Sequence, residues 1–175
     1  MTDLFKPYKR FGIFGPSESG KTTLAKKIAW HFWTAEKRPA LVLDPVSRGY
    51  WGPNAKVFTD EKTFWSEIFK QKNSLVVVDD ASVTINRDGE LNGVFTVLRH
   101  QGHKLLVIGH SAGNLLPQMR EQLQRIFLFL QNRDSVEKWS TVFPGSDLTP
   151  ALGLKQFQFL TAANYSDVQI IQLTK

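Results

Sequence analysis

A glycine-bounded segment near the N-terminus ends in a lysine and two threonines. Residues 15–23 read Gly-Pro-Ser-Glu-Ser-Gly-Lys-Thr-Thr. They satisfy the pattern G-x-x-x-x-G-K-[ST], in which glycines let successive backbone N–H groups turn toward a phosphate. The lysine of this pattern reaches the β- and γ-phosphates of a nucleoside triphosphate, and the next hydroxyl binds Mg²⁺. We therefore predict that ATP is bound by Gly15, Pro16, Ser17, Glu18, Ser19, Gly20, Lys21, Thr22 and Thr23. Lys21 is also predicted to act in catalysis, and Thr22 to be a magnesium ligand.

Two adjacent acids, Asp79 and Asp80, directly follow the apolar run at residues 75–78. Four apolar residues predict a strand inside a sheet, so both acids emerge at its C-terminal edge, where α/β proteins bind ligands. We predict that Asp79 holds Mg²⁺ and that Asp80 orients or deprotonates the attacking water. Two alternatives stay open. Adjacent acids are also found at plain helix caps and turns, and Asp44 is a rival acid after residues 40–43.

Residues 109–113, Gly-His-Ser-Ala-Gly, match the G-x-S-x-G pattern of serine hydrolases. The α/β-hydrolase fold that carries this motif needs its histidine later in the chain than the serine, and no histidine follows Ser111. The pattern therefore does not predict a hydrolase. His110 is instead predicted to be a polar sensor of the γ-phosphate, with a simple cap at a strand end as the alternative. We expect His100 and His103 to be surface residues rather than metal ligands.

Short apolar runs alternate with amphipathic stretches, which predicts an α/β fold with a mainly parallel sheet. Helix 20–33 places Leu24, Ile28 and Phe32 on one inward face. The pattern weakens after Asn132, and a turn is expected at residues 144–147. Strands are predicted at residues 11–14, 40–43, 75–78, 105–108 and 126–130, helices at 20–33, 63–70, 91–101 and 117–124, and two closing, antiparallel strands at 156–160 and 168–173.

The composition limits the number of domains, the cellular location and the kinds of partner that we expect. The chain has 175 residues, which fits one domain, and no apolar run approaches the length of a membrane span. We see no secretory signal and no cysteine, so disulfides and thiolate chemistry are excluded and an intracellular location is expected. A net charge of +6 favours a polyanionic partner such as nucleic acid, although surface lysines often serve only solvation.

The chain resembles the FtsK/HerA division of P-loop ATPases, and within it the genome-packaging ATPases of tailless icosahedral viruses with an internal membrane. The resemblance becomes specific in the second half of the chain. Four features carry the resemblance in order: Arg99 shortly before Gly102, the strand ending in His110, the Pro117-to-Arg120 helix start, and the apolar strand after Arg125. The resemblance covers roughly residues 10–131. His110 replaces a common glutamine, and Asp80 replaces a frequent glutamate.

The resemblance implies a RecA-like three-layer P-loop fold, with a core at about residues 10–131 and closing strands at about 155–175. It also implies a homohexameric ring that moves double-stranded DNA through its centre. In such rings a neighbouring subunit supplies an arginine finger. Arg99 is our first candidate for that finger and Arg120 the second. DNA contacts would be non-specific, to phosphates, with the loop at residues 82–90 and its Arg87 as a candidate.

The expected function is therefore an ATP-hydrolysing motor that packages a viral genome into a preformed capsid, with proteins of a capsid vertex as further partners. The expected location is the host cytoplasm or a packaging vertex of the virion. Another DNA-translocating ATPase of the same division, in conjugation or secretion, is the nearer alternative. A small nucleotide kinase is the next, although it lacks an arginine-rich lid. A GTPase-like switch is disfavoured, since the chain has no Asn-Lys-x-Asp run.

Overall fold

The computed structural model describes residues 5, 7–46, 49–79, 98, 100–164 and 166–174. Its contacts divide the chain into two compact units. The first unit combines Met1–Lys21 with Gly109–Lys175, and the second unit is Thr22–Ile108. The prediction of a single domain remains a prediction. In the described part of the chain, none of the helices combines the length and the apolar character needed to span a membrane.

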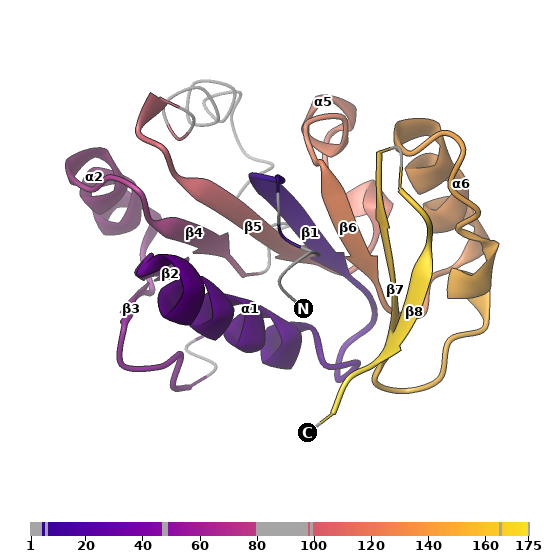
Figure 1. Cartoon of the computed structure of the whole chain (residues 1–175), viewed down its shortest axis with the longest axis horizontal. Coiled ribbons are helices and arrows are strands. Elements are labelled where there is room, and N and C mark those ends of the chain that lie inside the picture. The colour runs from indigo at the N-terminus through magenta and orange to yellow at the C-terminus, as the bar shows by residue number, and fades with distance from the viewer. Residues whose placement is uncertain are drawn as a thin grey trace. The chain divides into compact units, whose positions relative to one another are not determined.

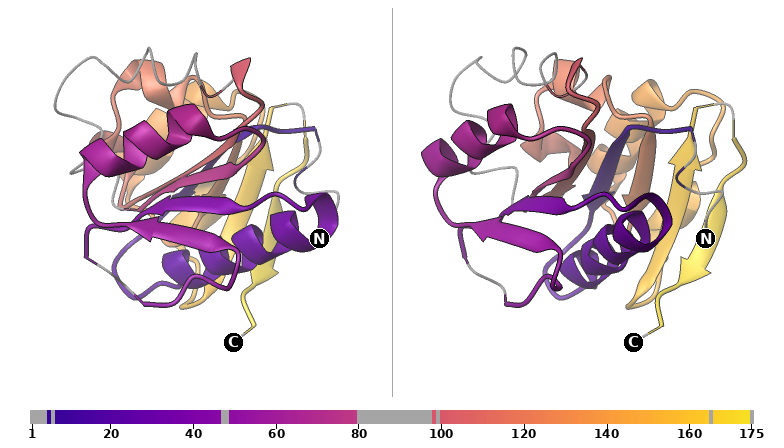
Figure 2. Two further views of the ribbon diagram at one scale, coloured as in Figure 1. Left: turned by 90° about the vertical axis from the view of Figure 1, so that its left-hand side faces the viewer. Right: turned by 60° about the vertical axis from the view of Figure 1, so that its left-hand side comes forward.

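The second unit is built on parallel strands. β2 (Ala40–Leu43) pairs with β3 (Ala55–Phe58) on one side and with β4 (Leu75–Val78) on the other, and β5 (Lys104–Gly109) follows β4. β2 and β4 are buried along their whole length, because their apolar residues are covered on both faces. Figure 2 shows α1 (Lys21–Glu36) and α2 (Glu61–Lys70) on opposite sides of these strands.

Both helices turn apolar faces inward. The predicted stripe of Leu24, Ile28 and Phe32 on α1 is buried, with at most 5% of any of these residues exposed. α2 begins at Asp60, whose carboxylate accepts a hydrogen bond from the Thr63 backbone N–H at 2.8 Å. This N-cap satisfies a donor that the first helical turn leaves unpaired. α2 buries Phe64 and Ile68 and packs on β2 and β3.

The first unit mixes parallel and antiparallel pairing. β1 (Arg10–Phe14) runs parallel to β6 (Arg125–Leu128), and β7 (Gln158–Ala163) and β8 (Gln169–Gln172) continue the order in antiparallel fashion (Figure 1). α6 (Arg133–Val142) packs against two 3₁₀ turns, η2 (Ala112–Asn114) and η3 (Thr149–Leu152). The Trp139 ring of α6 is fully buried, with its centroid 4.5 Å from that of Phe14.

The predicted mainly parallel arrangement with antiparallel closing strands is confirmed. Some boundaries were wrong: β6 ends at Leu128 instead of residue 130, and α5 (Pro117–Arg120) ends four residues before the predicted 124. β3 and α6 were not predicted. The helix expected at residues 91–101 lies largely outside the described residues.

Candidate nucleotide-binding site

The phosphate loop lies between β1 and α1, as the motif requires. Gly15 donates its backbone N–H to the Gly109 carbonyl at 3.3 Å, which ties the start of the loop to the end of β5. A Cβ at Gly15 would lie 2.5 Å from the Phe129 Cβ, so only glycine fits. Gly20 has a φ of +106°, in the region that L side chains rarely adopt. The two motif glycines are therefore required by close packing and by backbone conformation.

The Lys21 side chain folds back over the loop. Its Nζ donates to the Pro16 carbonyl at 2.7 Å, and only 6% of the residue is exposed. Burying an ammonium group is costly unless anionic or carbonyl oxygens surround it. A triphosphate supplies such oxygens, and the contact with Pro16 already holds the ammonium within the loop. The position of Lys21 therefore fits the predicted phosphate contact.

A buried hydroxyl in the loop gives a separate test of whether a phosphate fits. Ser19 is 7% exposed, and its Oγ has no hydrogen-bond partner among the described residues. Buried polar atoms are almost always paired, because an unsatisfied group retains its full desolvation cost. A phosphate oxygen bound in the loop would supply an acceptor for this hydroxyl. The loop therefore fits the phosphate group that its sequence predicts.

The predicted magnesium ligands lie together. The Thr22 Oγ1 donates to the Asp79 Oδ2 at 3.3 Å, and Asp79 is 1% exposed just after β4. The Asp79 backbone N–H bonds the Leu43 carbonyl at 2.9 Å, which fixes the carboxylate at the strand edge. A hydroxyl and a carboxylate are hard oxygen donors of the kind that Mg²⁺ prefers. These residues fit a magnesium ion that also binds nucleotide phosphates.

The rival acid has another contact. Asp44 is also buried, but its Oδ2 accepts a hydrogen bond from the Trp51 indole N–H at 3.1 Å. Asp79 contacts the motif threonine. Thr23 is exposed on α1. Asp80 and Arg99, together with Arg87 and its loop, lie outside the described residues.

The segment after β5 is organised by hydrogen bonds within the first unit. His110 is half-buried and follows Gly109, whose carbonyl accepts from Gly15 of the phosphate loop. His110 therefore directly follows the residue that bonds the phosphate loop, and its sensor role stays a prediction. The Asn114 Oδ1 at the end of η2 accepts hydrogen bonds from the Ser111 hydroxyl at 2.8 Å and from the Ser111 backbone N–H at 3.0 Å. The serine-hydrolase interpretation therefore has no support from the geometry.

Arg120 holds the same segment. Its Nη1 donates to the carbonyls of Ala112 and Leu115 at 2.8 and 2.6 Å. The Ala112 backbone N–H in turn donates to Ser135 Oγ at 2.9 Å, and Ser135 Oγ donates to Gln131 Oε1 at 2.5 Å. The turn that follows His110 is therefore held by the side chains of Arg120 and Ser135.

Sequence reasoning missed Ser135 and Gln131 because α6 was not predicted. A signal was present: Asn132 is an N-cap whose side chain accepts from the Ser135 backbone N–H at 2.8 Å. An asparagine before an amphipathic stretch is a typical helix start. Residues 154–156, which border the phosphate loop, were missed as well, and we find no motif in the sequence that marks them.

One histidine was wrongly placed at the surface. His103 is 3% exposed, and its Nδ1 accepts from the Ser74 backbone N–H at 3.1 Å, with Nε2 lying 3.1 Å from Gln101 Oε1. Burial lowers the pKa of His103 below its usual 6.5, against the opposite effect of backbone hydrogen bonds. His103 is therefore a neutral residue inside the second unit, whereas His100 is exposed as expected.

Comparisons with known proteins place this geometry in context. No protein-family model matches the chain, and no curated protein matches it. The structure of the genome-packaging NTPase B204 from Sulfolobus turreted icosahedral virus 2 with AMPPCP matches with a TM-score of 0.76 and 18% identity, covering 95% of this chain and 98% of that one. Its complex with ATP-γS gives 0.75 and 19%, covering 95% and 97%.

A second protein matches less well. The N-terminal domain of zonular occludens toxin from Neisseria meningitidis gives a TM-score of 0.61 at 17% identity, covering 96% of this chain and 95% of that one. The B204 matches extend over nearly the full length of both chains. The chain therefore has the P-loop fold of the viral genome-packaging NTPases.

Proposed function

We propose that this protein is an ATP-hydrolysing motor that translocates double-stranded DNA and packages a viral genome into a preformed capsid. One observation carries the proposal: a chain with an intact phosphate loop shares the fold of packaging NTPase B204 along nearly its whole length. That NTPase was crystallised with AMPPCP, ATP-γS and AMP. The net charge of +6 supports a polyanionic partner such as DNA.

We propose a role for each predicted site residue. The loop N–H groups and Lys21 hold the β- and γ-phosphates, and Thr22 with Asp79 holds Mg²⁺. When bound, the metal ion neutralises charge on the phosphate oxygens. Asp80 is proposed to deprotonate or orient the water that attacks the γ-phosphorus, and His110 is proposed to contact the γ-phosphate.

We propose a homohexameric ring in which a neighbour completes each site with an arginine. Arg99 is the first candidate, since the guanidinium of Arg120 bonds two carbonyls of its own subunit. An arginine finger neutralises charge that develops on the γ-phosphate. Mixing Arg99→Ala subunits with Lys21→Ala subunits should restore part of the activity, because some interfaces then combine an intact loop with an intact finger. Absence of rescue at every mixing ratio would refute this arrangement.

A zonular occludens toxin domain, which is not named as a packaging NTPase, shares this fold. A second function is therefore considered beside genome packaging. Another DNA-translocating ATPase of the FtsK/HerA type, serving conjugation or secretion, is that alternative. Both functions require DNA-dependent ATP hydrolysis, so they are distinguished by the DNA that the protein transports. Packaging predicts protection of the viral genome from nuclease in the presence of empty capsids, and protection with the protein omitted would argue against it.

The test for the enzymatic class is ATP turnover with and without double-stranded DNA. We expect DNA to stimulate the release of inorganic phosphate and Lys21→Ala to abolish it. Nucleoside monophosphates should not become phosphorylated. Transfer of the γ-phosphate to such an acceptor would identify a small nucleotide kinase instead. Negative-stain imaging with DNA and an ATP analogue should show six-fold rings, and a stable monomer would contradict the proposed assembly.

A further inference from the structure

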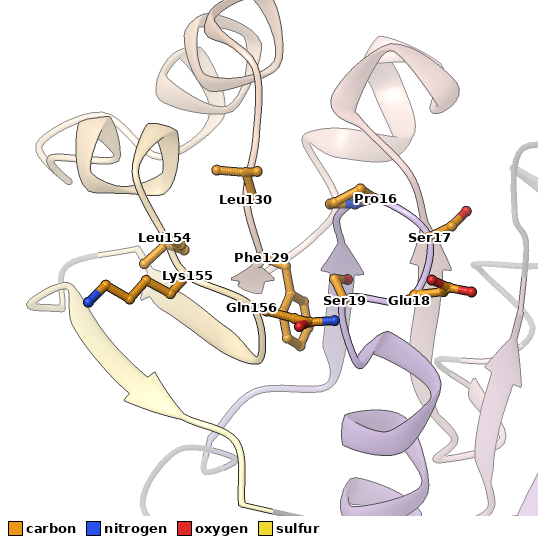
Figure 3. Close-up of a pocket in the computed structure, with 9 residues that line it drawn as sticks. All are labelled: Pro16, Ser17, Glu18, Ser19, Phe129, Leu130, Leu154, Lys155 and Gln156. Carbon is orange, nitrogen blue, oxygen red and sulfur yellow. The ribbon is translucent and has the colours of Figure 1, made fainter.

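A pocket of about 160 Å³ adjoins the phosphate loop within the first unit (Figure 3). Three segments line it: residues 16–19 of the loop, residues 129–130 after β6, and residues 154–156 after η3. The loop segment is shared with the proposed phosphate site, so a ligand whose phosphates occupy the loop has this pocket beside it. The pocket therefore belongs to the part of a nucleotide that extends beyond its phosphates.

The walls of the pocket are largely apolar. Pro16, Phe129, Leu130 and Leu154 contribute rings and aliphatic groups, and Leu130 remains 43% exposed. Apolar walls with a few placed polar groups are the usual design of sites for small organic ligands, because the walls cover the ligand and the polar groups select it. The faces of a nucleobase are flat and weakly polar. The walls thus match a base better than a ribose or a phosphate.

One polar group is directed at this space. In Figure 3 the Gln156 amide projects over the Phe129 ring toward Ser19, whereas the Lys155 ammonium points away from the loop. A glutamine amide offers a carbonyl acceptor next to N–H donors. Adenine presents the complementary pair on one edge, the N6 amino donor beside the N7 acceptor, and glutamine binds this edge in bidentate fashion. Hypoxanthine and guanine present two acceptors, O6 and N7, on that edge, so the carbonyl of the amide finds no donor there.

The backbone next to Gln156 is held in an unusual conformation. Phe157 has a φ of +62°, which is costly for a residue with a bulky side chain and persists only where the surroundings enforce it. Its carbonyl accepts hydrogen bonds from the Leu173 backbone N–H at 2.8 Å and from the Gln172 amide at 3.3 Å. A Cβ on Gly20 would lie 3.1 Å from its ring, so Phe157 also contacts the end of the phosphate loop. This turn fixes where Gln156 points.

We propose that this pocket holds the nucleobase and that Gln156 reads the amino edge of adenine, which makes the protein selective for ATP. The proposal rests on the proposed nucleotide-binding function and adds the specificity-determining residue. The loop supplies affinity for the triphosphate of any nucleotide, and Gln156 supplies the preference for one base. Affinity and selectivity are therefore separable by mutation.

The test compares binding of ATP, ITP and inorganic tripolyphosphate, each with Mg²⁺, by calorimetry. ITP carries a carbonyl oxygen in place of the adenine amino group that Gln156 is proposed to bind. We expect the full chain to bind ATP about five-fold or more tightly than ITP, since one bidentate pair discriminates by roughly five- to 150-fold. Gln156→Ala should bring the two affinities together and leave tripolyphosphate binding unchanged. Gln118→Ala, the same change at an exposed position of α5, should keep the wild-type ratio.

Each other outcome has a definite meaning. Equal wild-type affinities for ATP and ITP, or a wild-type ratio retained by Gln156→Ala, would overturn the base-reading proposal while leaving nucleotide binding intact. Failure of the wild-type chain to bind any of the three ligands would overturn the nucleotide-binding function itself. Selective ATP binding without DNA-stimulated hydrolysis would refute the motor and retain the role of Gln156. Melting curves of both variants exclude loss of folding as the cause.

Discussion

Gly15 packs closely against Phe129, the residue that follows β6, and this contact makes a testable prediction about the phosphate loop. In Gly15→Ala the new Cβ would lie 2.5 Å from the Phe129 Cβ and 3.2 Å from the Ser19 Oγ. Carbon atoms in van der Waals contact are normally about 3.5–4.0 Å apart, so the overlap with Phe129 is roughly 1 Å. The Phe129 Cβ cannot rotate away, because the backbone fixes it and the Phe129 N–H bonds the Phe14 carbonyl at 2.8 Å. The loop or the end of β6 must move.

Such overpacking costs about 1–3 kcal/mol of folding free energy. In a chain of this size each kcal/mol shifts the melting temperature by roughly 2–4 °C, so we expect Gly15→Ala to melt about 2–12 °C below the wild type. Displaced loop N–H groups also predict weaker ATP binding and slower hydrolysis, because a shift of about 1 Å in a positioned group can cost on the order of 100-fold in rate.

Differential scanning fluorimetry with and without ATP and Mg²⁺ measures both effects, with Gly113→Ala as the control. Gly113 lies in η2, and a Cβ there would meet nothing closer than 3.7 Å. The control should therefore keep its melting temperature and its ATP-dependent stabilisation. A Gly15→Ala protein that melts and binds ATP like the wild type would refute the packing of the loop on β6.

Three further predictions concern single side chains. Asp79→Asn should weaken the Mg²⁺-dependent part of ATP binding by about 10–100-fold, measured by calorimetry with Mg²⁺ and with EDTA. If the two ATP affinities differ as much as they do in the wild type, Asp79 is not a ligand of the metal. Arg120→Ala should lower the free energy of unfolding by about 1.5–3 kcal/mol in urea titrations, since its charged hydrogen bonds to the carbonyls of Ala112 and Leu115 are lost, whereas unchanged stability would mean that they contribute nothing. Because the pKa of His103 is lowered in the folded state, the unfolded chain binds more protons as the pH falls below about 6.5, so stability should decrease there. As the pH falls, His103→Asn should lose less folding stability than His100→Asn, the control at an exposed residue. Equal slopes of the unfolding free energy against pH would contradict the assignment of His103 as a buried neutral residue.

Much of the fold was predictable because the strand signal was strong. β2 and β4 are continuous apolar runs that the structure buries completely, and their predicted boundaries match. β3 escaped prediction because two of its four residues are exposed at the sheet edge, so its sequence lacks an apolar run. α6 escaped because only Ser135, Val136 and Trp139 are buried along its ten residues.

The candidate site was predictable where a local motif defines it, as with Lys21, Thr22 and Asp79. Residues that support the site through long-range contacts carry no such motif. Ser135 contacts the segment after β5 only because α6 packs on η2. Gln156 borders the phosphate loop because the chain returns to it more than a hundred residues later. Contacts of this kind depend on the tertiary fold, and one sequence does not reveal them.

The central claim is that ATP hydrolysis moves this protein along double-stranded DNA, and a triplex-displacement assay tests it most directly. A third strand bound to linear duplex DNA is stripped off by a motor that passes beneath it, and its release is followed by fluorescence. We predict release that requires ATP and Mg²⁺ and is absent with Lys21→Ala. A wild-type protein that hydrolyses ATP in the presence of this DNA but leaves the third strand bound would contradict translocation.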